Sequence, residues 1–119
     1  MIENVDALIW RAGQVDANGD VLAQEALEQM AAGVRPGAEI TLDFDFRNVI
    51  GRVVQAWVQG HDLYATISVD DKYAQDARDG KLALRPGFRI AAQHTDEDGV
   101  RIVDKVDIAH VALTPNPLP

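Results

Sequence analysis

Few of the side chains in this sequence could act as nucleophiles, general bases or metal ligands. The chain has no Cys, one Ser (Ser68) and three His (His61, His94 and His110). Without a thiol, a disulfide framework, a cysteine-based zinc site and a cysteine nucleophile are all excluded. A serine-dependent catalyst would have to use Ser68. The three His are far apart in the sequence and lack the helical spacing that places two imidazoles on one metal.

Clustered carboxylates offer acid–base or calcium chemistry, but each cluster also has a structural interpretation. Asp43 and Asp45 share one face of a regular strand and could form a catalytic pair, although the polar face of a half-buried strand needs such residues anyway. The stretch 16–20 matches the first oxygen positions of an EF-hand loop, but later positions lack the required Gly and Glu. A turn before a helix explains it better. The acidic run 96–99 is interpreted as a solvated hairpin loop, so no metal site or cofactor is predicted.

The composition narrows the class of protein. Acidic side chains outnumber basic ones by 19 to 11, which gives a formal charge of −8. This charge opposes binding to phosphate backbones, because that binding depends on Lys and Arg, so nucleic acid is not a predicted partner. No apolar run approaches the ~20 residues of a membrane span, and no secretory signal is recognised. We therefore predict a protein made in the cytoplasm, with one domain over 1–119 and no membrane partner.

The pattern along the chain predicts a small α+β domain dominated by antiparallel strands. Residues 5–11 predict a first strand, and residues 21–32 predict a helix with Asp20 as its N-cap and Gly33 after its end. Alternating apolar residues predict a second strand over 40–46. Five further elements are expected: a hairpin of strands over 48–58 and 63–69, a helix over 72–78 capped by Asp70 or Asp71, and strands over 81–94 and 100–113.

Three residues should interrupt these strands, and a proline-rich tail should end the chain. Gly51 marks a bulge or a close approach of two backbones. Pro86 and Gly87 cannot lie in an uninterrupted central strand, so the strand over 81–94 must bend, bulge or break there. The tail is expected over 114–119.

The order of these elements and four short motifs resemble the tailed-phage prohead (capsid maturation) protease family, whose fold is shared with the herpesvirus assemblins. The motifs lie at 16–21 (DANGDV), 45–53 (DFRNVIGRV), 84–88 (LRPGF) and 110–117 (HVALTPNP). Each motif is short, so their order and spacing carry the resemblance, which covers most of the chain. It implies a small, mostly antiparallel, barrel-like sheet with one or two short helices.

The resemblance also implies where a catalytic base and a nucleophile would lie, and both positions have changed. The family places its His immediately before the Asp that opens the second motif, where this chain has Phe44. It places its Ser two residues before the Gly of the third motif, where this chain has Arg85. A phenyl ring cannot accept a proton, and a guanidinium has no nucleophilic oxygen. In the final motif, His110 and Ala112 replace the family's Glu and Ser.

With these replacements, the resemblance predicts a non-enzymatic structural protein of a phage head. It would bind the capsid as a decoration or stabilising protein, with the major capsid protein or other head proteins as partners, and it would lie in the virion. One alternative is an active prohead maturation serine protease with an unusual triad that uses Ser68. Others are an assembly factor acting on capsid precursors, and an unrelated binding role on the same fold.

Residues of three kinds are candidate contacts with such a partner: Trp10, Trp57, Arg85, Arg89, Pro115 and Pro117. Trp is enriched at interface hot spots, although each Trp could equally belong to the core. The two Arg share a face if their strand is regular across the proline between them, and they could pair with acidic groups or remain solvated. The tail prolines would lose little entropy on docking. An exposed strand edge could also support a homo-oligomer.

Overall fold

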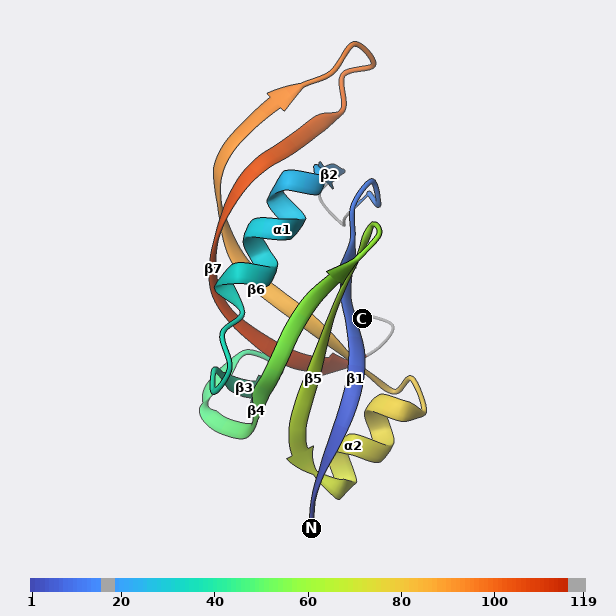
Figure 1. Ribbon diagram of the computed structural model, residues 1–119, viewed down its shortest axis with the longest axis vertical. Helices are drawn as coiled ribbons and strands as arrows, with labels where there is room; N and C mark the ends of the chain where they lie inside the picture. Colours follow the sequence, from blue (N-terminus) through green and yellow to red (C-terminus); the bar gives the residue numbers. More distant parts are fainter. Residues whose placement is uncertain (16–18, 116–119) are drawn as a thin grey trace.

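Seven strands and two helices make up the computed structural model, which describes residues 1–15 and 19–115, without the side chains of residues 108 and 109. The strands are β1 (Ile2–Arg11), β2 (Asp20–Leu22), β3 (Glu39–Leu42), β4 (Asp45–Gln59), β5 (Asp62–Asp70), β6 (Leu82–Thr95) and β7 (Arg101–Pro115). The helices are α1 (Gln24–Gly33) and α2 (Asp71–Arg78). This is the small, mostly antiparallel α+β fold predicted from the sequence (Figure 1).

The strands form one sheet that curls into a half-barrel. Along the sheet the order is β1-β5-β4-β3-β7, and β6 pairs with β7 along almost the whole length of both strands. Strands β2 and β3 pair with β7 in parallel, near its start and near its end, while the other paired strands are antiparallel. The curl brings β1 and β6 to opposite walls of a cavity of about 430 Å³.

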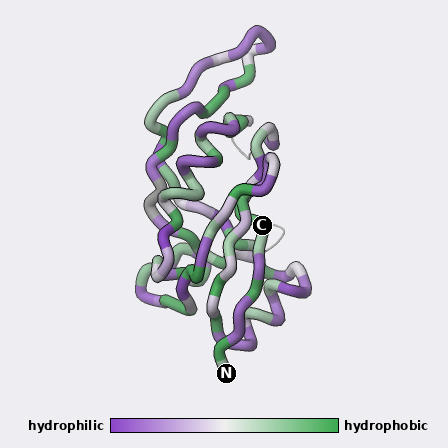
Figure 2. The backbone as a smooth tube through the Cα atoms, in the orientation of Figure 1, coloured by the Kyte–Doolittle hydropathy of each residue, from purple (hydrophilic) through white to green (hydrophobic). Residues whose placement is uncertain are grey.

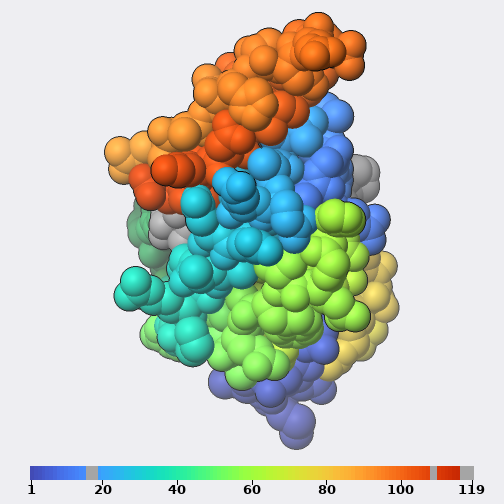
Figure 3. All heavy atoms as spheres, turned by 45° about the horizontal axis from the view of Figure 1, so that its top comes forward, coloured from blue at the N-terminus to red at the C-terminus, as the bar shows by residue number. Residues whose placement is uncertain are grey.

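The parts of β6 and β7 next to the turn that joins them extend past the half-barrel as a curved arm (Figures 1 and 3). The molecule measures 50 × 29 × 28 Å. Helix α1 packs along β7, where the Val106 amide donates to Gln29 Oε1 at 3.3 Å. Near the tip of the arm, Arg101 Nη2 donates to Asp20 Oδ2 at 3.0 Å, and Arg101 Nε donates to the other oxygen of the same carboxylate. Asp20 is therefore not the predicted helix cap, because Arg101 binds its carboxylate; α1 begins at Gln24.

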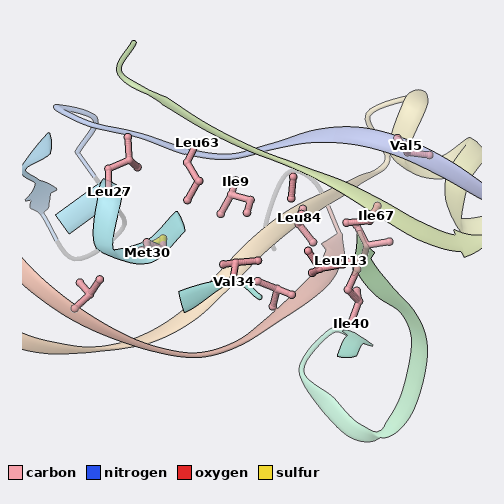
Figure 4. Packing of buried hydrophobic residues seen from close by; sticks show 14 of the residues in the cluster. Val5, Ile9, Leu27, Met30, Val34, Ile40, Leu63, Ile67, Leu84 and Leu113 are labelled. Carbon is pink, nitrogen blue, oxygen red and sulfur yellow. The ribbon is translucent and has the colours of Figure 1, made fainter. Parts of the chain in front are cut away.

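The hydrophobic core fills the inside of the curl. Strand β5 shows the predicted alternation, with Leu63, Ala65, Ile67 and Val69 buried between half-buried neighbours. Figure 2 shows hydrophobic and hydrophilic residues interleaved along the strands. In Figure 4, side chains from α1 and from several strands meet in one cluster, which includes Ile9, Leu27, Met30, Ile40, Leu63, Ile67, Leu84 and Leu113.

The predicted single strand over 40–46 is wrong. Leu42 ends β3 and pairs with Asp45, the first residue of β4, so Asp43 and Phe44 form a two-residue hairpin turn. Both turn residues have positive φ, at 52° and 61°. Asp43 and Asp45 therefore do not share a strand face as a catalytic pair. Asp45 Oδ1 instead accepts a hydrogen bond from Arg47 Nε at 3.2 Å.

Helix α2 confirms the prediction of a second, capped helix. Asp70 is its N-cap, and its carboxylate accepts a hydrogen bond from the Lys72 amide at 3.3 Å. A side-chain hydrogen bond with Asp71, followed by this backbone hydrogen bond, lowers the pKa of the Asp70 carboxyl below its ordinary value. Among the described residues, no helix is long and apolar enough to span a bilayer.

The predicted interruptions are present in the sheet. A Cβ at Gly51 would lie 2.4 Å from the Ser68 carbonyl oxygen, so β4 and β5 approach too closely there for any other residue. Strand β6 continues through Pro86, and its register with β7 shifts between Gly87 and Phe88. Strand β7 extends to Pro115, so the predicted tail starts too early; the rest of the predicted tail, including Pro117, lies outside the described residues, as do residues 16–18.

Candidate functional site

One of the two changed positions of the protease motifs, Phe44, contacts His110 of β7. The Phe44 and His110 rings contact edge to face, with centroids 5.1 Å apart and planes at 77°. Phe46 makes a similar contact with His110, at 4.8 Å and 75°. On the facing strand, Gly87 pairs with His110, and a Cβ there would lie 2.5 Å from His110 Nε2. We refer to Phe44, Phe46 and His110 as the aromatic cluster.

Arg85 lies on β6, two residues before Gly87, and it is half-buried. Its Nε donates to Thr114 Oγ1 at 3.0 Å, and Thr114 is almost completely buried. Arg89 lies beyond the register shift, exposed and opposite Asp107. The two Arg therefore face different neighbours on β7.

Phe44 reaches the aromatic cluster from a strained backbone conformation. Two-residue hairpin turns with positive φ at both positions favour Asn or Asp followed by Gly, because a Cβ clashes in this conformation. Asp43 suits its position, but a bulky ring at Phe44 costs about 1–2 kcal/mol. The Asp43 amide donates to the Leu113 carbonyl at 2.8 Å, which fixes the turn against β7 beside His110. Strained residues of this kind are concentrated at functional sites.

A cavity of about 450 Å³ opens next to the aromatic cluster, and we call it the hollow. Its walls come from β3, β4, β7 and the residue before β3: Ala38, Glu39, Thr41, Phe46, Val49 and His110. Strand β4 forms one wall because its register slips: Leu42 pairs with Asp45 and Thr41 with Val49, so residues 46–48 bulge away from β3. The bulge leaves Phe46 67% exposed and Val49 43% exposed.

Sequence reasoning missed three residues of the hollow, Glu39, Thr41 and Val49. The regular alternation of apolar and polar residues over 40–46 hides both the turn and the bulge. The only signal is that the alternation fails after Phe46, where Arg47 and Asn48 follow each other.

The predicted partner contacts do not form one surface. Trp57 stacks on Tyr64 across β4 and β5, with ring centroids 5.8 Å apart. Trp10 packs against the core and, with Arg85, lines the cavity between β1 and β6; its indole N–H has no hydrogen-bond partner among the described residues. Pro115 is exposed at the end of β7, opposite Leu82.

Ser68 and the other two His lie in separate parts of the structure. Ser68 is half-buried on β5, between Asn4 of β1 and Arg52 of β4. His61 lies in the turn between β4 and β5, and His94 lies on the arm. Within the described ranges, no three His, Cys, Asp or Glu side chains gather in a way that could hold a metal ion.

Comparison with solved structures identifies a close match in fold. No protein-family model matches the sequence, and no curated protein matches it. The structure is similar to that of the capsid assembly protease gp21 of bacteriophage T4, with a TM-score of 0.62 and 18% sequence identity. The match covers 96% of this chain and 82% of that chain. At this identity the similarity shows the fold alone, which is a prohead-protease-like half-barrel.

Proposed function

We propose that this protein is a non-enzymatic structural protein of a phage head, which binds the capsid as a decoration or stabilising protein. The observation that carries the proposal is the pair of replacements, Phe44 and Arg85, in a fold similar to that of a capsid assembly protease. Its partner would be the major capsid protein or another head protein, and its place would be in the virion.

The chemistry of the aromatic cluster supports a binding role. Catalysis by a Ser, Thr or Cys nucleophile needs its hydroxyl or thiol within hydrogen-bond reach of a base. Here the described contacts of His110 are with two phenyl rings and with the backbone of Gly87. None of the hydrogen bonds found among the described residues joins His110 to a hydroxyl group.

The surface beside the cluster supports the same role. Phe46 and Val49 are exposed next to each other at the mouth of the hollow. Exposed apolar side chains that gather around a concave site are typical of interaction surfaces. Phe46, which contacts the same His110 ring as Phe44, therefore forms part of a surface on which a partner could dock.

A sedimentation experiment tests capsid binding. The purified protein is mixed with purified phage heads of its own source and centrifuged, and the pelleted amount is measured against concentration. We expect saturable binding, and we expect Phe46→Ala to weaken it while Ile90→Ala, an exposed apolar residue on the arm, leaves it unchanged. If the wild-type protein stays in the supernatant at all concentrations, the proposal is wrong.

The alternative, an active maturation protease, is tested by incubation with capsid precursor. We expect no cleavage by the wild-type protein or by Ser68→Ala. Cleavage that requires Ser68 would support the protease. An assembly factor is distinguished by mass spectrometry of purified virions: it would be absent from the finished particle, whereas a decoration protein would be present in many copies per head.

A further inference from the structure

We propose that the hollow binds a basic side chain, arginine above all, from an extended segment of the partner protein. The inference rests on the proposed function, because it names the chemistry that a head protein would present to this site. Three polar groups in the hollow, and the apolar surface around them, carry the inference.

The three polar groups are the Glu39 carboxylate, the Thr41 hydroxyl and the His110 ring. Across the described part of the chain, none of the three makes a hydrogen bond or an ion pair. The Thr41 hydroxyl is the most informative, since Thr41 is only 4% exposed and buried polar groups are nearly always hydrogen-bonded. Unpartnered polar groups that converge on one cavity are typical of a ligand site.

The chemistry of these three groups favours a ligand that donates hydrogen bonds and carries positive charge. The carboxylate only accepts hydrogen bonds, while the hydroxyl and a neutral imidazole can each accept one. Neither of two basic side chains on β4, Arg52 and Arg47, forms an ion pair with Glu39. Arg52, opposite it on β4, donates to the Gly37 carbonyl at 3.2 Å, and Arg47 is paired with Asp45. The net charge of −8 also favours a cationic partner.

The apolar part of the hollow suits the stem of a long basic side chain. Ala38, Phe46 and Val49 line the cavity, and its volume of about 450 Å³ is ample for one such side chain. Long basic side chains bury their methylene groups and keep the charged end near a partner. Arginine fits better than lysine because its planar guanidinium can stack on Phe46 and can reach two acceptors with one fork of donors.

A peptide titration tests the inference on the full chain. Amide NMR spectra of the labelled protein are recorded with acetyl-Ala-Leu-Arg-Leu-Ala-amide and with the same peptide carrying uncharged citrulline. We expect saturable shifts at residues 38–49 and at His110 with the arginine peptide. The citrulline peptide should bind at least about tenfold more weakly, because it loses the charge-assisted hydrogen bond.

Two variants and one control locate the contact. We expect Glu39→Gln to weaken binding of the arginine peptide by about tenfold, and Thr41→Val to weaken it by about threefold. Glu97→Gln removes the same charge from the exposed tip of the arm and should change nothing. Equal binding of both peptides, shifts confined to other residues, no saturable shift, or an unaffected Glu39→Gln variant would each overturn the inference.

Head sedimentation separates this inference from the proposed function. If wild-type protein and Glu39→Gln bind heads equally, the hollow is not the contact, although the protein is still a capsid binder. If wild-type protein does not bind heads, the proposed function fails whatever the peptide does. If heads bind wild-type protein and Glu97→Gln but do not bind Glu39→Gln, both proposals are supported.

Discussion

Phe44 offers a direct test of the strained turn beside His110. Replacing it with Ala removes the ring but keeps a Cβ at φ 61°, whereas replacing it with Gly removes both the ring and the clash. A left-handed conformation costs a residue with a Cβ about 1–2 kcal/mol. The greater freedom of Gly in the unfolded chain offsets roughly 0.5–1 kcal/mol of the gain. We therefore expect Phe44→Gly to be more stable than Phe44→Ala by about 0.5–1 kcal/mol.

Urea denaturation measures the difference, and Phe46 supplies the matched control. With a slope of about 1.5 kcal/mol/M for a domain of this size, the midpoint of Phe44→Gly should lie roughly 0.3–0.7 M above that of Phe44→Ala. Phe46 is a strand residue without positive φ, so there the order should reverse, with Ala the more stable. If Ala equals or exceeds Gly at position 44, the turn is not strained and the reasoning is refuted.

Three other substitutions test contacts around the site and the arm by the same urea assay. Gly87→Ala would place a Cβ against the His110 ring and should cost about 1–3 kcal/mol of stability. Adding His110→Ala should restore most of the lost stability, and no rescue would mean that the ring is not the obstacle. Asp20→Asn removes the charge of one carboxylate that binds the Arg101 guanidinium and should cost about 2 kcal/mol, less than a fully buried pair because Arg101 is half-exposed. A cost under about 0.5 kcal/mol would contradict this. Thr41→Val removes an unpartnered buried hydroxyl and should stabilise the protein by about 1 kcal/mol, whereas a loss of stability would show that the hydroxyl has a partner.

The sequence predicts the elements of this fold better than it predicts the site. Hydrophobic period and capping residues are local properties, so the hairpin of β4 and β5 and helix α2 could be predicted within a few residues. The start of α1 could not be predicted, because the Asp20 carboxylate, which resembles a helix cap in the sequence, binds Arg101, 81 residues later in the chain. Pairing across such a distance leaves no local pattern.

The hollow was hidden for a related reason. An uninterrupted alternation of apolar residues over 40–46 is compatible with one straight strand, and nothing in it marks the reversal at Asp43 and Phe44. The reversal becomes visible only when Leu42 pairs with Asp45 and the turn binds to Leu113 of β7. The resemblance to the protease family identified position 44 as important, but it could not indicate that the ring there would lie against His110.

The proposed loss of catalytic chemistry and the formation of the hollow both involve the packing around His110. A Gly or Asn at position 44 would be less strained in this turn, so the ring must gain more from its contacts than the backbone loses. Its ring contacts His110, which also contacts Phe46. His110 and Phe46 also line the hollow. The replacement that removes the expected base therefore also supports the wall of a binding site, which links the proposed loss of proteolysis to the proposed capsid contact.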